Sequence, residues 1–350
     1  MGMTSTNATN DIFDIYNIPS TTTQRIFMGL WCAITFSSAF VGNLAVLYAS
    51  IKHDAIKLDR ISTILIKNIA LADIGYSFYI MITLITIVND TWIFGDVMCN
   101  VINYMHLFFA ISEIYLICAL NVSKLHVLLF PLQARVRSAK SGYILAIIMW
   151  SVQPVLHLIP TVIMKRIQSF RLTFYTCEGY FVGSSKLTQV FPAIAAMLFA
   201  MLPMLVVIIA VIWILHYVRR VQGLQKQSIF TLLFISLCYI CSYLPYGAYY
   251  ILKVVISDID TNVPISVHYY RFAVYVMYFN FSINPMIYIF TVKSYQEFLR
   301  GALTSTKKSV SDAKFSVASK IISLYSTTNS ASQQASHPVS ANNANVDTQE

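Results

Sequence analysis

Residues 61–88 read ISTILIKNIALADIGYSFYIMITLITIV, an apolar run whose only charged residues are Lys67 and Asp73. A helix needs about 20 mostly apolar residues to cross the hydrocarbon core of a bilayer, so this run is long enough. Six more such runs lie along the chain: 26–51, 98–130, 143–164, 188–218, 228–256 and 266–291. The alternating segments typical of membrane-barrel strands do not occur, which leaves helices to satisfy the backbone hydrogen bonds in lipid. The sequence predicts an all-α membrane protein with seven transmembrane helices.

The composition excludes most soluble classes of protein. Hydrophobic residues make up 57% of the chain and charged residues 11%, against about 45–50% and about 25% in a soluble domain. An enzyme needs a convergent acid, base or metal cluster, and the sequence contains no HExxH motif, no Gly-rich phosphate loop and no paired metal ligands. We therefore expect neither enzymatic activity nor a cofactor. The net charge of +9 indicates contact with anionic membrane lipids rather than with nucleic acid.

Polar segments flank the apolar region at both ends. Residues 1–25 are rich in Ser, Thr, Asn and Asp, and residues 302–350 hold little that could be buried, so we expect a disordered tail there. Lys and Arg favour the cytoplasmic side of short loops, and most of them fall on the inner side if the N-terminus lies outside. The predicted division is an extracellular tail (1–25), a transmembrane domain with a short eighth helix (26–301) and a cytoplasmic tail (302–350).

Short motifs occur in a fixed order along the seven runs. They are Gly42-Asn43, Asn68-Ile69-Ala70-Leu71-Ala72-Asp73, Trp92 with Cys99, Trp150, Pro203, Pro245, and Asn280 with Asn284-Pro285-Met286-Ile287-Tyr288. Each motif is weak alone, but their order and spacing together are specific. On these motifs the chain resembles a rhodopsin-like (class A) G-protein-coupled receptor over about residues 26–301.

The resemblance implies a plasma-membrane receptor that binds an extracellular ligand and signals to a heterotrimeric G protein, with receptor kinases and arrestin acting on its tail. It also implies a disulfide between Cys99 and Cys177 on the oxidising outer side. Residues 293–300 suit the family's amphipathic eighth helix, and Asn7 begins an outer glycosylation sequon. A transporter or channel, with its ion path along Asp73 and Glu113, is the rival class.

Carboxylates inside a membrane are costly, which marks Asp73 as functional. In the receptors that the chain resembles, the equivalent Asp binds a sodium ion together with Asn side chains of helix seven, here Asn280 and Asn284. Glu113 is a departure, because the family usually carries Ser there. Two close carboxylates would share a proton or hold a cation; alternatively, Glu113 stays protonated and hydrogen-bonds a neighbouring helix. No metal other than sodium is expected.

The inner end of the third run departs from the family pattern. Ser123-Lys124-Leu125 stands where the family has Asp-Arg-Tyr, so the ion pair that restrains the Arg is missing and Lys lacks the planar fork of Arg. By resemblance, the activation switch also includes Pro245, Pro285 and Tyr288. Tyr243 replaces the Trp that the family carries in this switch. Two hypotheses fit: a receptor that still couples, with high basal activity, or one that binds ligand and couples weakly or only through arrestin.

A ligand pocket is expected between helices three, five, six and seven. By resemblance its residues are Asn103, His106, Tyr243, Tyr246, Tyr250, Tyr270, Arg271, Tyr275 and Tyr278. His106 stands where amine receptors carry an Asp, which disfavours a monoamine ligand. Tyr278 stands where opsins carry the Lys that binds retinal, so a retinal Schiff base is excluded at this position. Basic residues at the outer mouth could receive the carboxylate of a peptide or a small acid, or could meet lipid head groups and nearby acids instead.

Overall fold

The computed structural model describes residues 21–52, 60–153, 170–172, 179–181, 198, 201–218, 223–259, 267–292, 295–297, 300, 301 and 304. The first helical segments are α2 (Thr22–Ser37), η1 (Ser38–Gly42) and α3 (Asn43–Lys52), which form one rod. They are followed by α4 (Arg60–Asn89), α5 (Gly95–Leu129), α6 (Pro131–Val136), α7 (Ala139–Gln153), α10 (Leu202–Val218), α11 (Gly223–Ile259) and α12 (Val267–Thr291). A short antiparallel hairpin, β1 (Phe170–Leu172) with β2 (Gly179–Phe181), lies in the predicted second outer loop.

The long helices agree with the apolar runs of the sequence. Among the described residues, five helices are long and apolar enough to cross a membrane: Thr22–Ile51, Arg60–Asn89, Val97–Leu129, Lys226–Tyr249 and Arg271–Thr291. The fourth and fifth predicted spans are described in part, as α7 and α10, and both parts are helical. The all-helical prediction is therefore confirmed over the part of the chain that the structure describes, with the hairpin as an addition.

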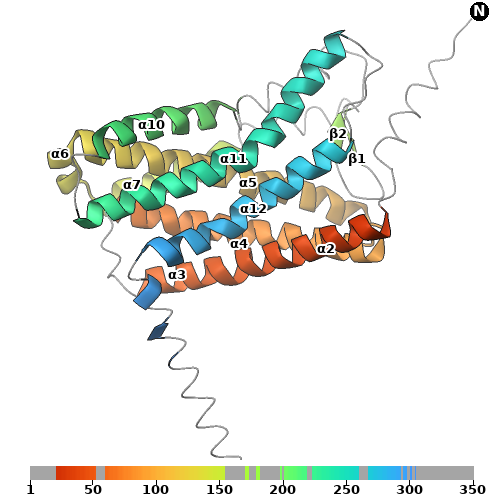
Figure 1. Cartoon of the computed structure of the whole chain (residues 1–350), viewed down its shortest axis with the longest axis horizontal. Helices are drawn as coiled ribbons and strands as arrows, with labels where there is room; N and C mark the ends of the chain where they lie inside the picture. Colours follow the sequence, from red (N-terminus) through yellow and green to blue (C-terminus); the bar gives the residue numbers. More distant parts are fainter. Residues whose placement is uncertain are drawn as a thin grey trace, which may run out of the picture. The chain divides into compact units, whose positions relative to one another are not determined.

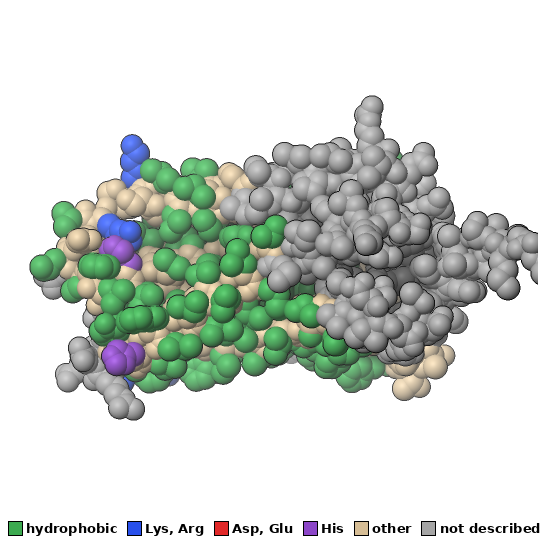
Figure 2. Space-filling model, turned by 90° about the horizontal axis from the view of Figure 1, so that it is seen from above, with side chains coloured by type: hydrophobic (Ala, Val, Ile, Leu, Met, Phe, Trp, Pro, Cys, Tyr) green, Lys and Arg blue, Asp and Glu red, His purple; other side chains and the backbone are tan. Residues whose placement is uncertain are grey.

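The helices pack side by side as a bundle (Figure 1). Helix α4 packs against α2, α3, α5 and α7, while α11 packs along α12 and α10 lies against α5. Figure 2 shows a face of the described helices covered by hydrophobic side chains, with Lys, Arg and His gathered at one end. Such a surface suits a lipid environment, because water would not solvate it.

The first rod closely approaches the proline of α12. Pro285 has no N–H, so the carbonyl oxygen of Phe281 loses its helical hydrogen bond. The Nδ2 atom of Asn43 donates to that oxygen at 3.0 Å, and the Oγ of Ser38 donates to the carbonyl oxygen of Ser282 at 2.9 Å. A β-carbon on Gly42 would lie 2.7 Å from Cγ of Pro285. The residue at position 42 must therefore be Gly for the two helices to approach this closely.

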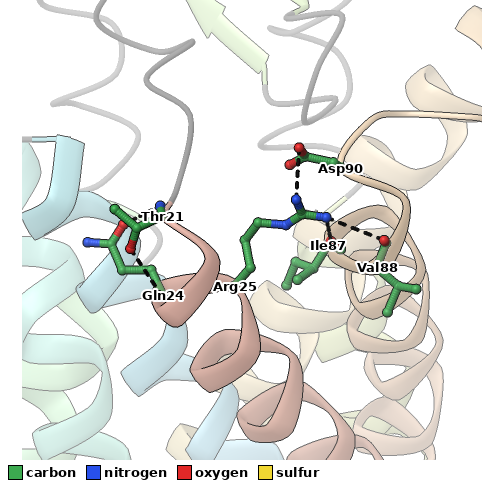
Figure 3. A network of polar contacts seen from close by, with 6 residues as sticks. All are labelled: Thr21, Gln24, Arg25, Ile87, Val88 and Asp90. Carbon is green, nitrogen blue, oxygen red and sulfur yellow. Dashed lines mark hydrogen bonds and ion pairs between the residues drawn. The ribbon is translucent and has the colours of Figure 1, made fainter.

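A polar cluster joins the N-terminal end of α2 and the C-terminal end of α4 (Figure 3). Thr21 and Gln24 form a capping box that satisfies the first N–H groups of α2. One turn on, Arg25 pairs with Asp90 at 2.9 Å and donates to the carbonyl oxygens of Ile87 and Val88. These carbonyls close the end of α4 and have no intrahelical donor there, so Arg25 caps α4 from the neighbouring helix.

The chain divides into a unit that ends at Tyr295 and a second unit that begins at Gln296. In the first unit, the Tyr295 and Ser50 hydroxyls lie 2.6 Å apart, and burial raises the pKa of Tyr295 to about 12. In the second unit, Gln296, Glu297, Arg300, Gly301 and Thr304 are helical. The predicted apolar face of the eighth helix at Phe298 and Leu299 lies outside the described residues.

Candidate functional site

A buried polar centre lies in the middle of the bundle. The four residues predicted to act together, Asp73, Glu113, Asn280 and Asn284, are all 0% exposed. Asp73 comes from α4, Glu113 from α5 and the two Asn residues from α12. We call these four residues the carboxylate network. The structure brings all of them together, although they are up to 211 residues apart in sequence.

Glu113 is the most highly connected member of the carboxylate network. Its Oε1 accepts hydrogen bonds from Nδ2 of Asn280 at 2.6 Å and from Nδ2 of Asn284 at 3.0 Å. Its Oε2 accepts a third from the hydroxyl of Tyr243 in α11 at 3.2 Å. Buried polar groups in proteins are normally hydrogen-bonded, and three donors satisfy this carboxyl group well. Glu113 therefore links three helices, α5, α11 and α12, through one side chain.

Asp73 is supported less completely. Its Oδ2 accepts from Nδ2 of Asn284 at 3.0 Å, whereas its Oδ1 is buried without a hydrogen-bond partner among the described residues. The amide oxygens of Asn43, Asn280 and Asn284 are likewise buried and without a partner in that part of the chain. These oxygens are acceptors that face no donor, which costs free energy unless a cation or an added proton supplies one.

The donor set fits a hard cation or a proton. Carboxylate and amide oxygens suit ions such as sodium, whereas transition metals prefer imidazole and thiolate. Within the described helices no group of three or more His, Cys, Asp or Glu side chains could hold a metal. Two buried carboxyl groups that share one Asn donor cannot both ionise without a compensating positive charge.

An aromatic cluster lies beside the carboxylate network. His106 Nδ1 lies 2.9 Å from the hydroxyl of Tyr76, and its ring is 4.3 Å from the ring of Tyr79. Tyr278 contacts both tyrosines, with ring centroids 6.0 Å and 6.1 Å away. The ring of Tyr76 also stacks on Phe281 at 3.6 Å. This cluster joins α4, α5 and α12 next to the predicted pocket.

The predicted pocket residues fall into three groups. His106, Tyr243 and Tyr278 are buried, and Tyr243 contacts Glu113 in the carboxylate network. Tyr246, Arg271 and Tyr275 are partly exposed. The side chains of Asn103, Tyr250 and Tyr270 lie outside the described residues. Tyr76 and Tyr79 were not predicted, because nothing in their apolar helix distinguishes them from other interior aromatics.

The predicted switch residues lie on α5, α11 and α12, with Ser123 and Lys124 near the C-terminal end of α5 and Tyr288 near that of α12. Ser123 and Lys124 are buried, and the Ser123 hydroxyl and the Tyr288 hydroxyl have no hydrogen-bond partner in the described segments. Leu125 is partly exposed. Pro245 and Pro285 both lie inside continuous helices. The switch therefore retains its positions but lacks the negative charge that the family places at 123 and the guanidinium that it places at 124.

Neutral hydrogen bonds tie the N-terminal half of α11 to its neighbours. Ser236 donates to Oδ1 of Asn121 in α5 at 2.9 Å, and Thr231 donates to Oγ1 of Thr291 in α12 at 2.8 Å. Gln227 also donates to the carbonyl oxygen of Thr291. Helix α11 is thus restrained near its N-terminal end by uncharged side chains.

Two predictions concern the outer side. Cys99 is buried and disulfide-bonded, and Cys177, its predicted partner, lies outside the described residues, so this pairing stays a prediction. Cys32, Cys118, Cys238 and Cys241 are free, as expected for helix residues. Asn7, the predicted glycosylation site, also lies outside the described residues.

Comparison with known proteins gives one family and several receptors. A family model described as 7 transmembrane receptor (rhodopsin family) matches residues 42–288. C-C chemokine receptor type 1 of Homo sapiens is 25% identical over 276 residues, which cover 77% of this chain and 77% of that receptor. C-C chemokine receptor type 3 of Cavia porcellus is 22% identical over 275 residues, covering 77% and 76%. The matched residues include the whole carboxylate network.

Proposed function

Because the chain belongs to the rhodopsin family of seven-transmembrane receptors, we propose that it binds an extracellular ligand and signals to a heterotrimeric G protein. Family membership confirms the predicted class and the seven-helix bundle, and makes the chain a multi-pass plasma-membrane receptor rather than an enzyme. The coupling and the ligand are our proposals.

The observation that carries the coupling proposal is the set of hydrogen bonds around Glu113. Glu113 contacts α11 through Tyr243 and α12 through Asn280 and Asn284. A ligand that changes the contacts of Glu113 can therefore shift both α11 and α12. Such a shift would carry the signal from the outer half of the bundle to the inner ends of these helices. Such an arrangement, in which one site biases a two-state element, is what a receptor needs.

The ligand that we propose is a peptide or small protein with an acidic group, and C-C chemokines are the first candidates. Support comes from the relatives, which are C-C chemokine receptors at 22–25% identity, and from the outer half of the bundle. There, His106 replaces the Asp expected for amines, and Arg271 at the start of α12 is partly exposed. A small organic acid is the alternative ligand.

We also propose that the carboxylate network holds one positive charge, either a sodium ion or a shared proton. The partnerless oxygens of Asp73, Asn280 and Asn284 would face a sodium ion, which would neutralise the second carboxylate. A shared proton would do the same by removing one charge. The two occupants are distinguished by the response of the receptor to its medium. A sodium ion makes the agonist response depend on sodium concentration, and a shared proton makes it depend on pH.

For the topology we propose an extracellular N-terminus and a cytoplasmic tail. The basic residues of the predicted inner loops support this. The proposal extends to the Cys99–Cys177 disulfide, to glycosylation at Asn7, to contacts with anionic lipids, and to receptor kinases and arrestin at the Ser- and Thr-rich tail.

A second candidate is a receptor that binds ligand and couples weakly or only through arrestin. The observation that favours it is at the inner end of α5, where Lys124 is 8% exposed and the Ser123 hydroxyl is buried without a partner among the described residues. A buried Lys next to a Ser presents less to a G protein than a freed Arg does.

The test is a live-cell assay of G-protein dissociation and arrestin recruitment with C-C chemokines, other peptides and small acids. Activation of a G protein by one of them supports the main proposal. Arrestin recruitment without a G-protein signal supports the second candidate. Ion current in expressing membranes without any G protein would contradict both and favour a channel.

A further inference from the structure

Two departures of the sequence from the family pattern meet in the structure. Glu113 replaces a Ser in helix three, and Tyr243 replaces a Trp in helix six. The hydroxyl of Tyr243 donates to Oε2 of Glu113 at 3.2 Å. Tyr243 is 2% exposed and Glu113 is 0% exposed, so water does not compete for this hydrogen bond. The two unusual residues are therefore direct partners that span α5 and α11.

Tyr243 lies close to the point in α11 where the helix can bend. Tyr243 lies two residues before Pro245, which leaves the carbonyl oxygen of Cys241 without its helical hydrogen bond and weakens the helix there. The part of α11 between Gln227 and Tyr243 is about 24 Å long, at about 1.5 Å per residue. A bend of about 10° at Pro245 would therefore shift the inner end by about 4 Å.

We propose that the Tyr243–Glu113 hydrogen bond is a latch that holds α11 against α5 in the state described by the structure. Movement of α11 away from α5 breaks the latch. Breaking it leaves a buried carboxyl oxygen without that donor, and an unsatisfied buried acceptor is expensive, more so when charged. The effect of the latch on signalling rests on the proposed receptor function, whereas its effect on the position of α11 does not.

The chain offers a closely matched control for this hydroxyl. Tyr239 lies one turn before Tyr243 on α11, is 0% exposed, and has its ring 5.2 Å from that of Tyr243. Its hydroxyl has no hydrogen-bond partner among the described residues. Tyr239→Phe therefore removes a buried hydroxyl from the same helix without removing a bond to Glu113.

The experiment measures the position of α11 in purified receptor without ligand or G protein. Spin labels are placed at Lys226→Cys on α11 and Val136→Cys on α6, both of which are exposed, with the exposed Cys241 replaced by Ala. Pulsed distance measurements give the ratio of open to closed receptors. Four receptors are compared: wild type, Tyr243→Phe, Glu113→Ser and the double variant, with Tyr239→Phe as the control.

We expect Tyr243→Phe to raise the open-to-closed ratio about tenfold, which corresponds to about 1.4 kcal/mol. In the Glu113→Ser background the same change should have an effect below about twofold, since its partner is already gone. Tyr239→Phe should resemble wild type.

An equal effect of Tyr243→Phe in both backgrounds, or an equal effect of Tyr239→Phe, would overturn the latch. If the Glu113→Ser receptor does not fold, the comparison of Tyr243→Phe with Tyr239→Phe decides alone. A latch that opens in this measurement while cells show no G-protein signal would contradict the proposed coupling and leave the latch standing.

Discussion

At the scale of single residues, Lys124 decides whether the altered inner end of α5 still works. Lys124 keeps a positively charged donor at a buried position, and Arg would add a planar fork of donors. If the receptor couples as proposed, Lys124→Arg should change ligand-stimulated G-protein activation by less than about tenfold, the equivalent of 1.4 kcal/mol. A larger gain, measured at equal surface expression, would show that the wild-type switch is impaired.

Glu113 supports a second prediction at this scale. Glu113→Ser leaves Asp73 as the one carboxylate of the carboxylate network, so no charge has to be shared with a neighbour. We expect the dependence of the agonist response on sodium or on pH, whichever the wild type shows, to change. The measurement is a set of dose–response curves in sodium and choline buffers and at neutral and mildly acidic pH.

The matched control for Glu113→Ser is Ser112→Ala. The Ser112 hydroxyl is buried and has no hydrogen-bond partner among the described residues, and it is not part of the carboxylate network. Unchanged sodium and pH dependence in Glu113→Ser would mean that Glu113 does not share a charge with Asp73.

The sequence predicted site residues correctly where a side chain is unusual for a membrane helix. Asp73 and Glu113 stand out because acids are rare in membrane helices, and the structure places them with Asn280 and Asn284. Tyr76 and Tyr79 were missed because tyrosines are common in apolar helices. The Tyr243–Glu113 contact was missed because it depends on how α5 and α11 are rotated and crossed, which one sequence does not encode in any local pattern.

At the scale of elements, the approach of the first rod to α12 makes a steric prediction. A β-carbon at Gly42 would lie 2.7 Å and 2.8 Å from the ring of Pro285, whereas one at Gly29 would have no neighbour closer than 3.9 Å. Gly42→Ala should lower stability by about 1–3 kcal/mol, as overpacking does, and Gly29→Ala should not. Thermal unfolding of the two purified variants in detergent checks this, and equal melting temperatures would contradict the observed approach.

Element boundaries followed from hydropathy to within a few residues. The run 61–88 became α4 at Arg60–Asn89, and the run 266–291 became α12 at Val267–Thr291. Helix α6 and the β1–β2 hairpin were missed, because both are short and lie in loops, where no apolar run marks them. The π-helical turn η1, which packs against α12, was also missed, because no pattern in its own residues marks it.

At the scale of the whole molecule, the exposed apolar side chains of α6 need a partner. Leu132 and Val136 are 77% and 84% exposed on this short helix, which directly follows the C-terminal end of α5. Under the proposed coupling, Leu132→Ala should reduce G-protein activation by about tenfold or more, as for an interface anchor, and leave ligand binding unchanged.

The control for Leu132→Ala is Leu30→Ala, because Leu30 is 61% exposed on α2, where lipid would cover it. Radioligand binding and nucleotide exchange on the same membranes provide both readouts. Equal nucleotide exchange by the two variants would show that α6 does not contact the G protein.

The hydrogen bonds between the first rod and α12 have a consequence for how the receptor is made. Asn43 is among the first helix residues to leave the ribosome, and the Phe281 carbonyl that it satisfies is among the last. Until α12 is inserted, the amide of Asn43 lacks this acceptor; until the first rod docks, the break at Pro285 lacks its donor. Helix α12, the last transmembrane helix to be synthesised, therefore supplies the acceptor for Asn43 of the first rod, and a chain that stops before residue 281 lacks this hydrogen bond.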